Sequence, residues 1–128
     1  MNLLLDTHTL LWWAHEPAEL SATALEAIAD ERNEVFASAV SAMEIATKQR
    51  GGKLEYTTPL ASRFLEVLAD FGFKPLSVSC AHAQLAGSLP GDHRDPWDRL
   101  LAAQSQVEQL PLVSMDKRIA EWKISTLW

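Results

Sequence analysis

Residues 1–13 read MNLLLDTHTLLWW, an apolar stretch that is interrupted by one acid, Asp6. We interpret residues 3–5 as a short buried strand and residues 7–14 as the first turns of a helix. Counting histidine as neutral, Asp6 carries the only side-chain charge before Glu16. A lone carboxylate beside buried surface is costly unless it is hydrogen-bonded, paired or bound to a metal ion. The stretch therefore predicts a strand–helix unit whose junction carries an acid that needs a partner.

The alternation of strands and helices continues along the chain. Proline and small polar residues mark helix starts at Ser21, at Thr58-Pro59, at Ser79 and at Asp95-Pro96, and glycines mark helix ends at residues 51–52 and 72. The expected helices cover residues 7–14, 22–31, 40–50, 59–71, 80–89, 96–108 and 117–122, and the expected strands cover residues 3–5, 34–37, 74–78 and 112–114, with an edge strand over 124–127. This order predicts an α/β fold, a three-layer α/β/α sandwich with a central, mostly parallel sheet. At 128 residues, we expect a single domain over residues 1–128.

Composition places the chain among ordinary globular proteins, with 48% hydrophobic and 22% charged residues. Cys80 is the only cysteine, which excludes a disulfide framework and favours a reducing cytoplasm. No run approaches about 18 apolar residues, so we expect no membrane span. The first residues lack a basic segment and are interrupted by Asp6, which argues against a signal peptide.

The net charge of −6 lacks the basic footprint of most nucleic-acid-binding proteins. Acids that share a metal ion would be partly neutralised, however, and basic residues lie near the acids of interest: Lys48, Arg50, Lys53, Arg94, Arg99, Lys117 and Arg118. The alternative is that these residues are solvated helix ends.

Four acids lie where an apolar element ends or begins: Asp6, Glu44, Asp98 and Asp116. Ligands gather at the carboxyl ends of the strands in open α/β sheets, and Asp6 and Asp116 both follow such ends. Converging carboxylates repel one another without a cation, and Mg²⁺ or Mn²⁺ suits an all-oxygen ligand set. A bound ion could then activate water for phosphodiester hydrolysis.

Each acid also has a purely structural alternative. Asp6 could cap the helix that starts at Thr7, Glu44 could be an exposed helix position, and Asp116 could cap its own short helix. Asp95 precedes Pro96 as an N-cap should, and Asp98 would suit the dipole of the first turn. The joint placement of the acids favours a shared site.

Five blocks in this order resemble PIN-domain proteins of the VapC type, the toxins of type II toxin–antitoxin modules. They are LLLDTHTLLWW at 3–13, SAMEIA at 41–46, HRDPWDRLLAAQ at 93–104, LVSMD at 112–116 and TLW at 126–128. The resemblance implies an Mg²⁺-dependent endoribonuclease with an α/β/α fold that cuts RNA, forms a homodimer and is restrained by a cognate antitoxin. It assigns catalytic and metal-binding roles to Asp6, Glu44, Asp98 and Asp116. Ser114 keeps a hydroxyl where the family often has threonine, and Asp95 is left as a cap or an outer-shell residue.

Other functions fit less well. A haloacid-dehalogenase phosphatase needs a second aspartate two residues after Asp6, where His8 stands, and a receiver domain needs an acid pair that is absent. The remaining alternative is a non-catalytic PIN-like domain that binds RNA or protein, whose hallmark would be a lost acid.

We expect the five tryptophans to pack in the core or an interface, with stacking on RNA bases as the alternative. His93 is expected to be a loop histidine, and a phosphate contact is its alternative. An arginine from the antitoxin could pair with the acids. The surface around Trp12 and Trp13, or around Leu60, Phe64 and Leu68, could receive the rest of the antitoxin tail.

Overall fold

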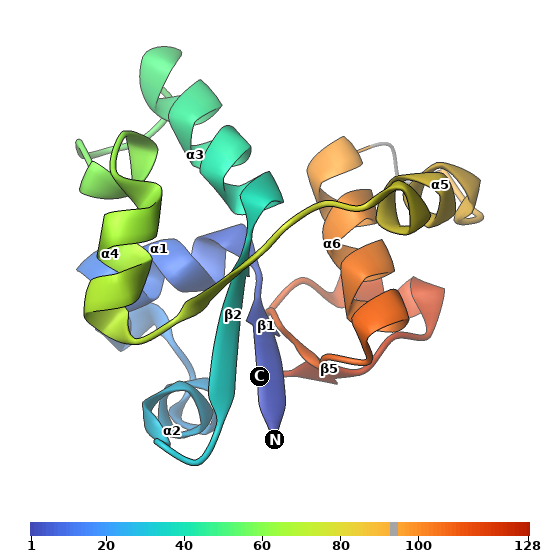
Figure 1. Cartoon of the computed structure of the whole chain (residues 1–128), viewed down its shortest axis with the longest axis horizontal. Helices are drawn as coiled ribbons and strands as arrows, with labels where there is room; N and C mark the ends of the chain where they lie inside the picture. Colours follow the sequence, from blue (N-terminus) through green and yellow to red (C-terminus); the bar gives the residue numbers. More distant parts are fainter. Residues whose placement is uncertain (93–94) are drawn as a thin grey trace.

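Within the residues that the computed structural model describes, 1–92 and 95–128, five strands form one wholly parallel sheet (Figure 1). The expectation placed on His93, and the basic residue Arg94, lie outside the described residues. In their order across the sheet the strands are β3 (Lys74–Leu76), β2 (Glu34–Ser38), β1 (Asn2–Leu5), β4 (Leu112–Val113) and β5 (Thr126–Leu127). The predicted parallel sheet is confirmed, and the strand expected near residues 124–127 forms one edge.

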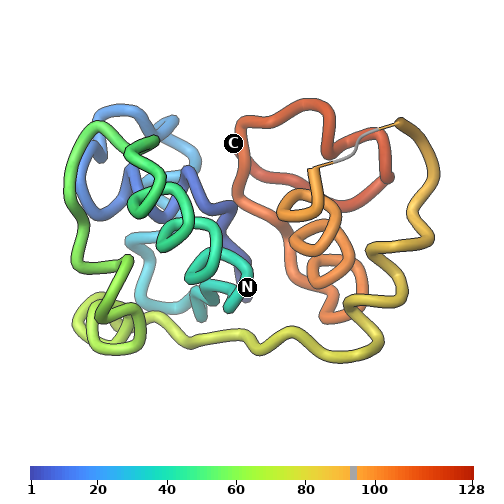
Figure 2. Tube along the Cα trace, turned by 90° about the horizontal axis from the view of Figure 1, so that it is seen from above, coloured from blue at the N-terminus to red at the C-terminus, as the bar shows by residue number. Residues whose placement is uncertain are grey.

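Helices cover both faces of the sheet. The α-helices are α1 (Thr7–His15), α2 (Ala22–Ala29), α3 (Ala39–Arg50), α4 (Phe64–Phe71), α5 (Cys80–Ser88) and α6 (Pro96–Glu108), and the 3-10 helices are η1 (Pro17–Glu19), η2 (Pro59–Ala61) and η3 (Lys117–Trp122). Figures 1 and 2 place α1, α2 and α4 on one side of the molecule and α5 and α6 on the other. None of the helices in the described part of the chain is long and apolar enough to cross a membrane.

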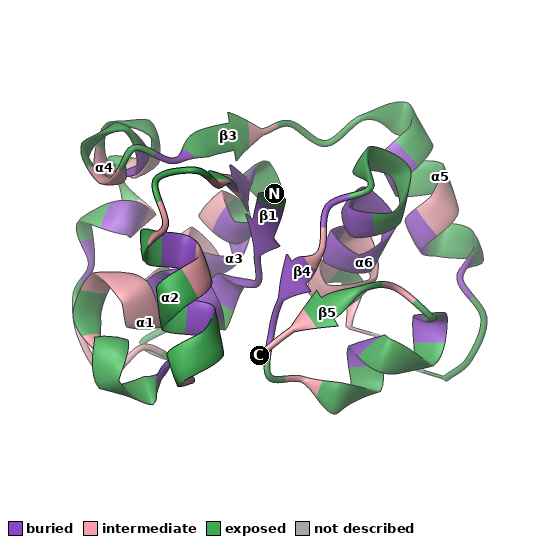
Figure 3. Ribbon diagram, turned by 90° about the horizontal axis from the view of Figure 1, so that it is seen from below, coloured by how far each residue is buried: buried purple, intermediate pink, exposed green. Residues whose placement is uncertain are grey.

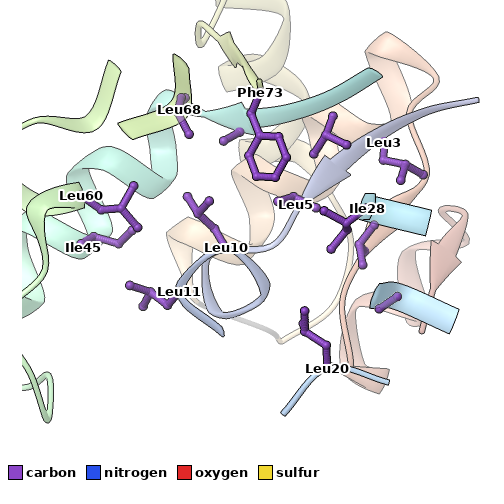
Figure 4. Close-up of a cluster of buried hydrophobic side chains, with 14 residues drawn as sticks. Leu3, Leu5, Leu10, Leu11, Leu20, Ile28, Ile45, Leu60, Leu68 and Phe73 are labelled. Atoms are coloured by element: carbon purple, nitrogen blue, oxygen red, sulfur yellow. The ribbon is translucent and has the colours of Figure 1, made fainter. Parts of the chain in front are cut away.

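The central strand β1 joins two hydrophobic cores because its side chains alternate between the faces of the sheet. Leu3 and Leu5 pack with residues of α1, α2 and α4, as Figure 4 shows. Leu4 packs on the opposite face, with residues of α6 and η3. All three leucines are fully buried, and Figure 3 shows β1 and β4 as buried strands. The three-layer sandwich is therefore confirmed.

The prediction of one continuous helix over residues 59–71 is wrong, because the structure has two separate elements there, η2 and α4. The N–H of Thr58 donates to Gln49 Oε1 at 2.7 Å, and the Thr58 hydroxyl lies 2.8 Å from His15 Nε2. These bonds hold the start of η2 against α1 and α3. The backbone then leaves helical geometry at Ser62 and Arg63 (φ −127° and −131°) before α4 begins.

The broken helix also corrects part of the expected partner surface. Leu60 and Leu68 are each 1% exposed and belong to the core of Figure 4. They are therefore unavailable to an antitoxin tail. On α4 the large exposed apolar side chain is that of Leu65.

The strand order places a topological switch point between β1 and β4. From β1 the chain first builds β2 and β3 on one side, then crosses to build β4 and β5 on the other. Figure 2 shows the segment after β3 crossing between the two halves of the molecule. Ligands bind at such a point, beyond the carboxyl ends of the strands. In this chain, Asp6 follows β1 there, and Ser114 and Asp116 follow β4.

Candidate active site

A pocket of about 470 Å³ is lined by all four predicted acids, Asp6, Glu44, Asp98 and Asp116. Asp95 and the basic residues Lys48, Lys117 and Arg118 also line it. The structure thus brings the four acids to one pocket, while their catalytic and metal-binding roles stay predictions. Within residues 1–92 and 95–128, no three acidic, histidine or cysteine side chains are already grouped as metal ligands. Basic side chains pair with several of the acids instead.

Asp6 is buried at the junction of β1 and α1, with 6% of its surface exposed. Its side chain makes no cap bond to α1, so the capping alternative is wrong for this residue. Its Oδ2 instead accepts a 2.7 Å hydrogen bond from the Ser114 hydroxyl, and its N–H donates to Val113 O at 3.1 Å. Asp6 is therefore held against the end of β4.

Burial raises the pKa of Asp6 above its ordinary value, and the nearby charge of Glu44 raises it further. The Ser114 hydroxyl and His8 act in the opposite direction, because a hydrogen bond and a positive charge both favour the ionised carboxylate. The net effect is a raised pKa. A divalent cation placed near Asp6 would relieve the cost of its ionisation.

Ser114 connects the two loops that carry Asp6 and Asp116. Its hydroxyl donates to Asp6 and accepts a 3.1 Å hydrogen bond from the N–H of Asp116. The Ser114 side chain is buried, so water does not replace its hydroxyl as the partner of the Asp6 carboxylate and the Asp116 N–H. Sequence resemblance pointed to a hydroxyl at this position, and the structure adds its two partners.

Replacing Ser114 with alanine should destabilise the fold by about 1–3 kcal/mol, because the buried carboxylate of Asp6 and the partly buried N–H of Asp116 lose a partner. It should also shift the onset of any activity that needs the ionised Asp6 carboxylate to higher pH, since the pKa of Asp6 rises without the hydroxyl. Thermal unfolding and a pH–rate profile measure both effects. Ser114→Thr should restore them, and Ser125→Ala, on an exposed residue, should change neither. Wild-type behaviour of Ser114→Ala would contradict this role.

Glu44 lies on α3 and is 4% exposed, so the structural alternative of an exposed helix position is wrong. Its Oε2 lies 2.5 Å from Lys48 Nζ, one helical turn along. The hydroxyls of Thr7 and Ser41 lie 2.8 Å apart and tie α1 to α3 one turn before Glu44. Glu44 is therefore fixed beside the junction that carries Asp6.

Asp95, Asp98 and Asp116 combine structural and pocket positions. The Asp95 side chain caps α6 by accepting from Trp97 N at 2.9 Å and Asp98 N at 3.4 Å, as its alternative predicted. Asp116 caps η3 by accepting from Arg118 N at 2.9 Å. Both caps still line the pocket, beside Asp98 in the first turn of α6. A capping role and a place in the site therefore coexist.

Of the described basic residues that were expected near the acids, three line the pocket, whereas Arg50, Lys53 and Arg99 do not. Lys48, Lys117 and Arg118 line the pocket. Arg99 instead donates from Nε to Ala86 O at 2.9 Å and lies over the Trp122 ring. Its contacts are those of a structural residue that joins α5, α6 and η3.

His8 and Trp12 line the pocket as well, and sequence reasoning did not place them there. Their rings lie 5.9 Å apart on α1, and the spacing of four residues between them, on the helix that follows Asp6, was the available signal. Trp12 also packs against Trp128, with ring centroids 5.9 Å apart. Trp13 packs on Phe73 in the same way, which agrees with the expected packing role of these tryptophans.

The donor set of the pocket is chemically compatible with a hard divalent cation. Its acids offer carboxylate oxygens, the ligands that Mg²⁺ and Mn²⁺ prefer. Asp6 and Glu44 are both buried, and the charge of Glu44 raises the pKa of Asp6, an effect that a cation would offset. Cys80 is exposed on α5 and does not line the pocket.

Comparisons with known proteins identify the family of the chain. The PIN domain family model matches residues 3–124. Ribonuclease VapC22 of Mycobacterium tuberculosis is 34% identical over 122 residues, which cover 92% of this chain and 89% of that protein.

Solved structures share the fold at low identity. VapBC2 from Rickettsia felis, bound to a promoter DNA fragment, aligns over 98% of this chain and 96% of its own with 15% identity and a TM-score of 0.69. FitAB bound to an IR36 DNA fragment covers 98% and 93% with 15% identity and a TM-score of 0.63. A toxin–antitoxin complex from Klebsiella pneumoniae covers 92% and 89% with 17% identity and a TM-score of 0.58.

Proposed function

The chain belongs to the PIN domain family, and from this premise we propose that it is an Mg²⁺-dependent endoribonuclease of the VapC type, the toxin of a type II toxin–antitoxin pair. The proposal is carried by the pocket at the switch point. This pocket is lined by all four acids that the family resemblance predicts. The 34% identity to a ribonuclease supports RNA as the substrate. The non-catalytic alternative is disfavoured because no acid of the four is lost.

Asp6, Glu44, Asp98 and Asp116 are the residues that would hold Mg²⁺, with Mn²⁺ as a substitute. When bound, the cation would supply a water of lowered pKa and offset negative charge on the phosphate. Ser114 keeps Asp6 oriented and favours its ionised form. Lys48, Lys117 and Arg118 bring positive charge to the pocket wall, where an RNA backbone phosphate would lie.

We further propose that an antitoxin silences the protein in the cytoplasm by placing an arginine in this pocket. The similarity to chains from toxin–antitoxin complexes supports such a partner. The pocket already accommodates one guanidinium, that of Arg118 beside Asp116. A homodimer is part of the same proposal.

Asp98→Asn should abolish both RNA cleavage and the growth arrest caused by expressing the chain without its partner. The amide keeps the shape of the side chain but lacks the charge that a cation needs. The Asp98 side chain is 14% exposed, and its partner Arg118 also pairs with Asp116. Arg118 therefore keeps an acidic partner in the variant, and the variant should fold. Cleavage of total RNA, growth after induction and thermal unfolding test these expectations.

Asp70→Asn, on an exposed acid of α4, is the matched control and should behave as the wild type. Unfolding of Asp98→Asn would make Asp98 chiefly structural. Equal growth of wild type and variant, with no small partner co-purifying, would contradict the toxin role. Absence of cleavage by the wild type would favour the non-catalytic alternative.

A further inference from the structure

Two basic side chains of the pocket bind its acids directly. Lys48 Nζ lies 2.5 Å from Glu44 Oε2. The Arg118 guanidinium contacts both oxygens of Asp116, at 3.1 Å through Nε and 2.9 Å through Nη2, and the same Nη2 lies 3.8 Å from Asp98 Oδ2. Three of the four acids expected to hold a cation thus have a basic partner from the same chain.

The acids are held in place, whereas their basic partners reach into solvent. The side chains of Glu44, Asp98 and Asp116 are 6%, 14% and 21% exposed. Those of Lys48 and Arg118 are 33% and 64% exposed. Exposed side chains change rotamer on the picosecond to nanosecond timescale, so the basic groups can leave while the acids stay.

We propose that Lys48 and Arg118 are built-in counter-ions, which occupy the acids in the metal-free protein and move to RNA backbone phosphate when a divalent cation binds. This inference rests on the proposed function. A carboxylate oxygen engaged by an ammonium or a guanidinium is a weaker ligand for a cation, and the positive charges repel an incoming cation across the few ångströms of the pocket. Entry of the cation should therefore weaken both pairs and release the basic groups.

Release of the two groups leaves the local structure intact. Asp116 caps η3 through the backbone N–H of Arg118, and that bond does not depend on the guanidinium. Lys48 lies in the last turn of α3, and its movement leaves the backbone hydrogen bonds of the helix unchanged. The pair of Arg118 with Asp116 has an exposed partner, and such pairs contribute little to stability. The pair of Lys48 with Glu44 has a buried partner, whose charge a bound cation would offset in place of Lys48.

The exchange also explains how a chain with a net charge of −6 could bind a polyanion. Among the described residues, the acids that line the pocket outnumber its basic groups in the metal-free state, five to three. One bound divalent cation would offset two of the negative charges and leave Lys48 and Arg118 facing the pocket. Guanidinium and ammonium groups are the usual partners of phosphate oxygens.

The first test measures metal binding without RNA. Arg118→Gln and Lys48→Met should each bind Mn²⁺ more tightly than the wild type, by roughly three- to tenfold, because a competing positive charge is gone. Titration followed by electron paramagnetic resonance gives the affinity, and thermal unfolding checks the fold. Arg118→Lys keeps the charge and should stay close to the wild type. Arg63→Gln is the control, since Arg63 is 65% exposed and pairs with Glu66 outside the pocket.

The second test measures RNA binding with Ca²⁺ in place of Mg²⁺. The same two variants should bind labelled single-stranded RNA more weakly, and the slope of log affinity against log salt should fall by about 0.7 for each charge removed. Arg63→Gln should leave affinity and slope unchanged.

Unchanged or weaker Mn²⁺ binding by both variants, or no Mn²⁺ binding by the wild type, would overturn the counter-ion role. Tighter Mn²⁺ binding with unchanged RNA affinity would overturn the transfer to phosphate. A wild type that fails to cut RNA would contradict the proposed function but not the counter-ion role, because the metal titration contains no RNA.

Discussion

Asp6→Asn is expected to lower RNA cleavage by about a thousandfold or more, because it removes a charge at the centre of the site. The same change should stabilise the metal-free protein. Asp6 is buried beside Glu44, so ionisation of Asp6 costs free energy in the folded protein. Asparagine keeps an oxygen that can accept the Ser114 hydrogen bond and has no charge to bury.

The pH dependence follows from the raised pKa of Asp6. The folded chain holds this proton to a higher pH than the unfolded chain, whose carboxyl group has its ordinary pKa of 3.8. The contribution of Asp6 to stability is therefore fully present below 3.8 and is lost as pH rises through the folded pKa. Thermal unfolding in chelator, measured against pH, should show this loss in the wild type and not in Asp6→Asn.

Asp30 offers a control of opposite sign. Its hydrogen bond to Arg32 lowers the pKa of Asp30 to about 2, so its contribution is present above 3.8 and is lost as pH falls toward 2. Asp30→Asn should remove this loss of stability at acidic pH and leave RNA cleavage unchanged. An Asp6→Asn variant that is less stable than the wild type at neutral pH, or that still cuts RNA, would contradict the role given to Asp6.

Complete removal of divalent ions by a chelator is expected to abolish cleavage, and Mg²⁺ or Mn²⁺ should restore it. The reason is that the pocket supplies carboxylates and basic groups but no nucleophile with a partner base among the residues described as lining it. Mg²⁺ at 100 times its dissociation constant should also raise the free energy of unfolding by about 2.7 kcal/mol. Gel assays of RNA and thermal unfolding with added Mg²⁺ measure the two effects.

Two variants make this result specific. Cys80→Ser should keep full activity, because Cys80 is exposed on α5 away from the pocket. Asp116→Asn should lose most of the stabilisation by Mg²⁺. Cleavage that persists after exhaustive chelation would exclude a required metal ion.

Much of the fold could be read from local patterns. The apolar run ending at Asp6 predicted β1 and α1, and the capping residues Ser21, Ser79 and Asp95 each accept the expected backbone hydrogen bond. These features depend on residues within a few positions of one another. The prediction failed at residues 59–71, where contacts of Thr58 with Gln49 and His15 interrupt a helix that local preferences alone would continue.

The site shows the same division. The sequence by itself determined which acids carry the charge, that Asp6 and Asp116 follow strands, and that Glu44 is the only charged residue between residues 39 and 47. Only the tertiary structure decided that Asp6 bonds to Ser114, 108 positions away, and does not cap its helix. Only the tertiary structure separated Arg118, which binds the acids, from Arg99, which binds backbone carbonyls. The physical reason is that charge and periodicity are local properties of the sequence. Burial and the partner of each polar group depend instead on which distant segments the parallel sheet brings together.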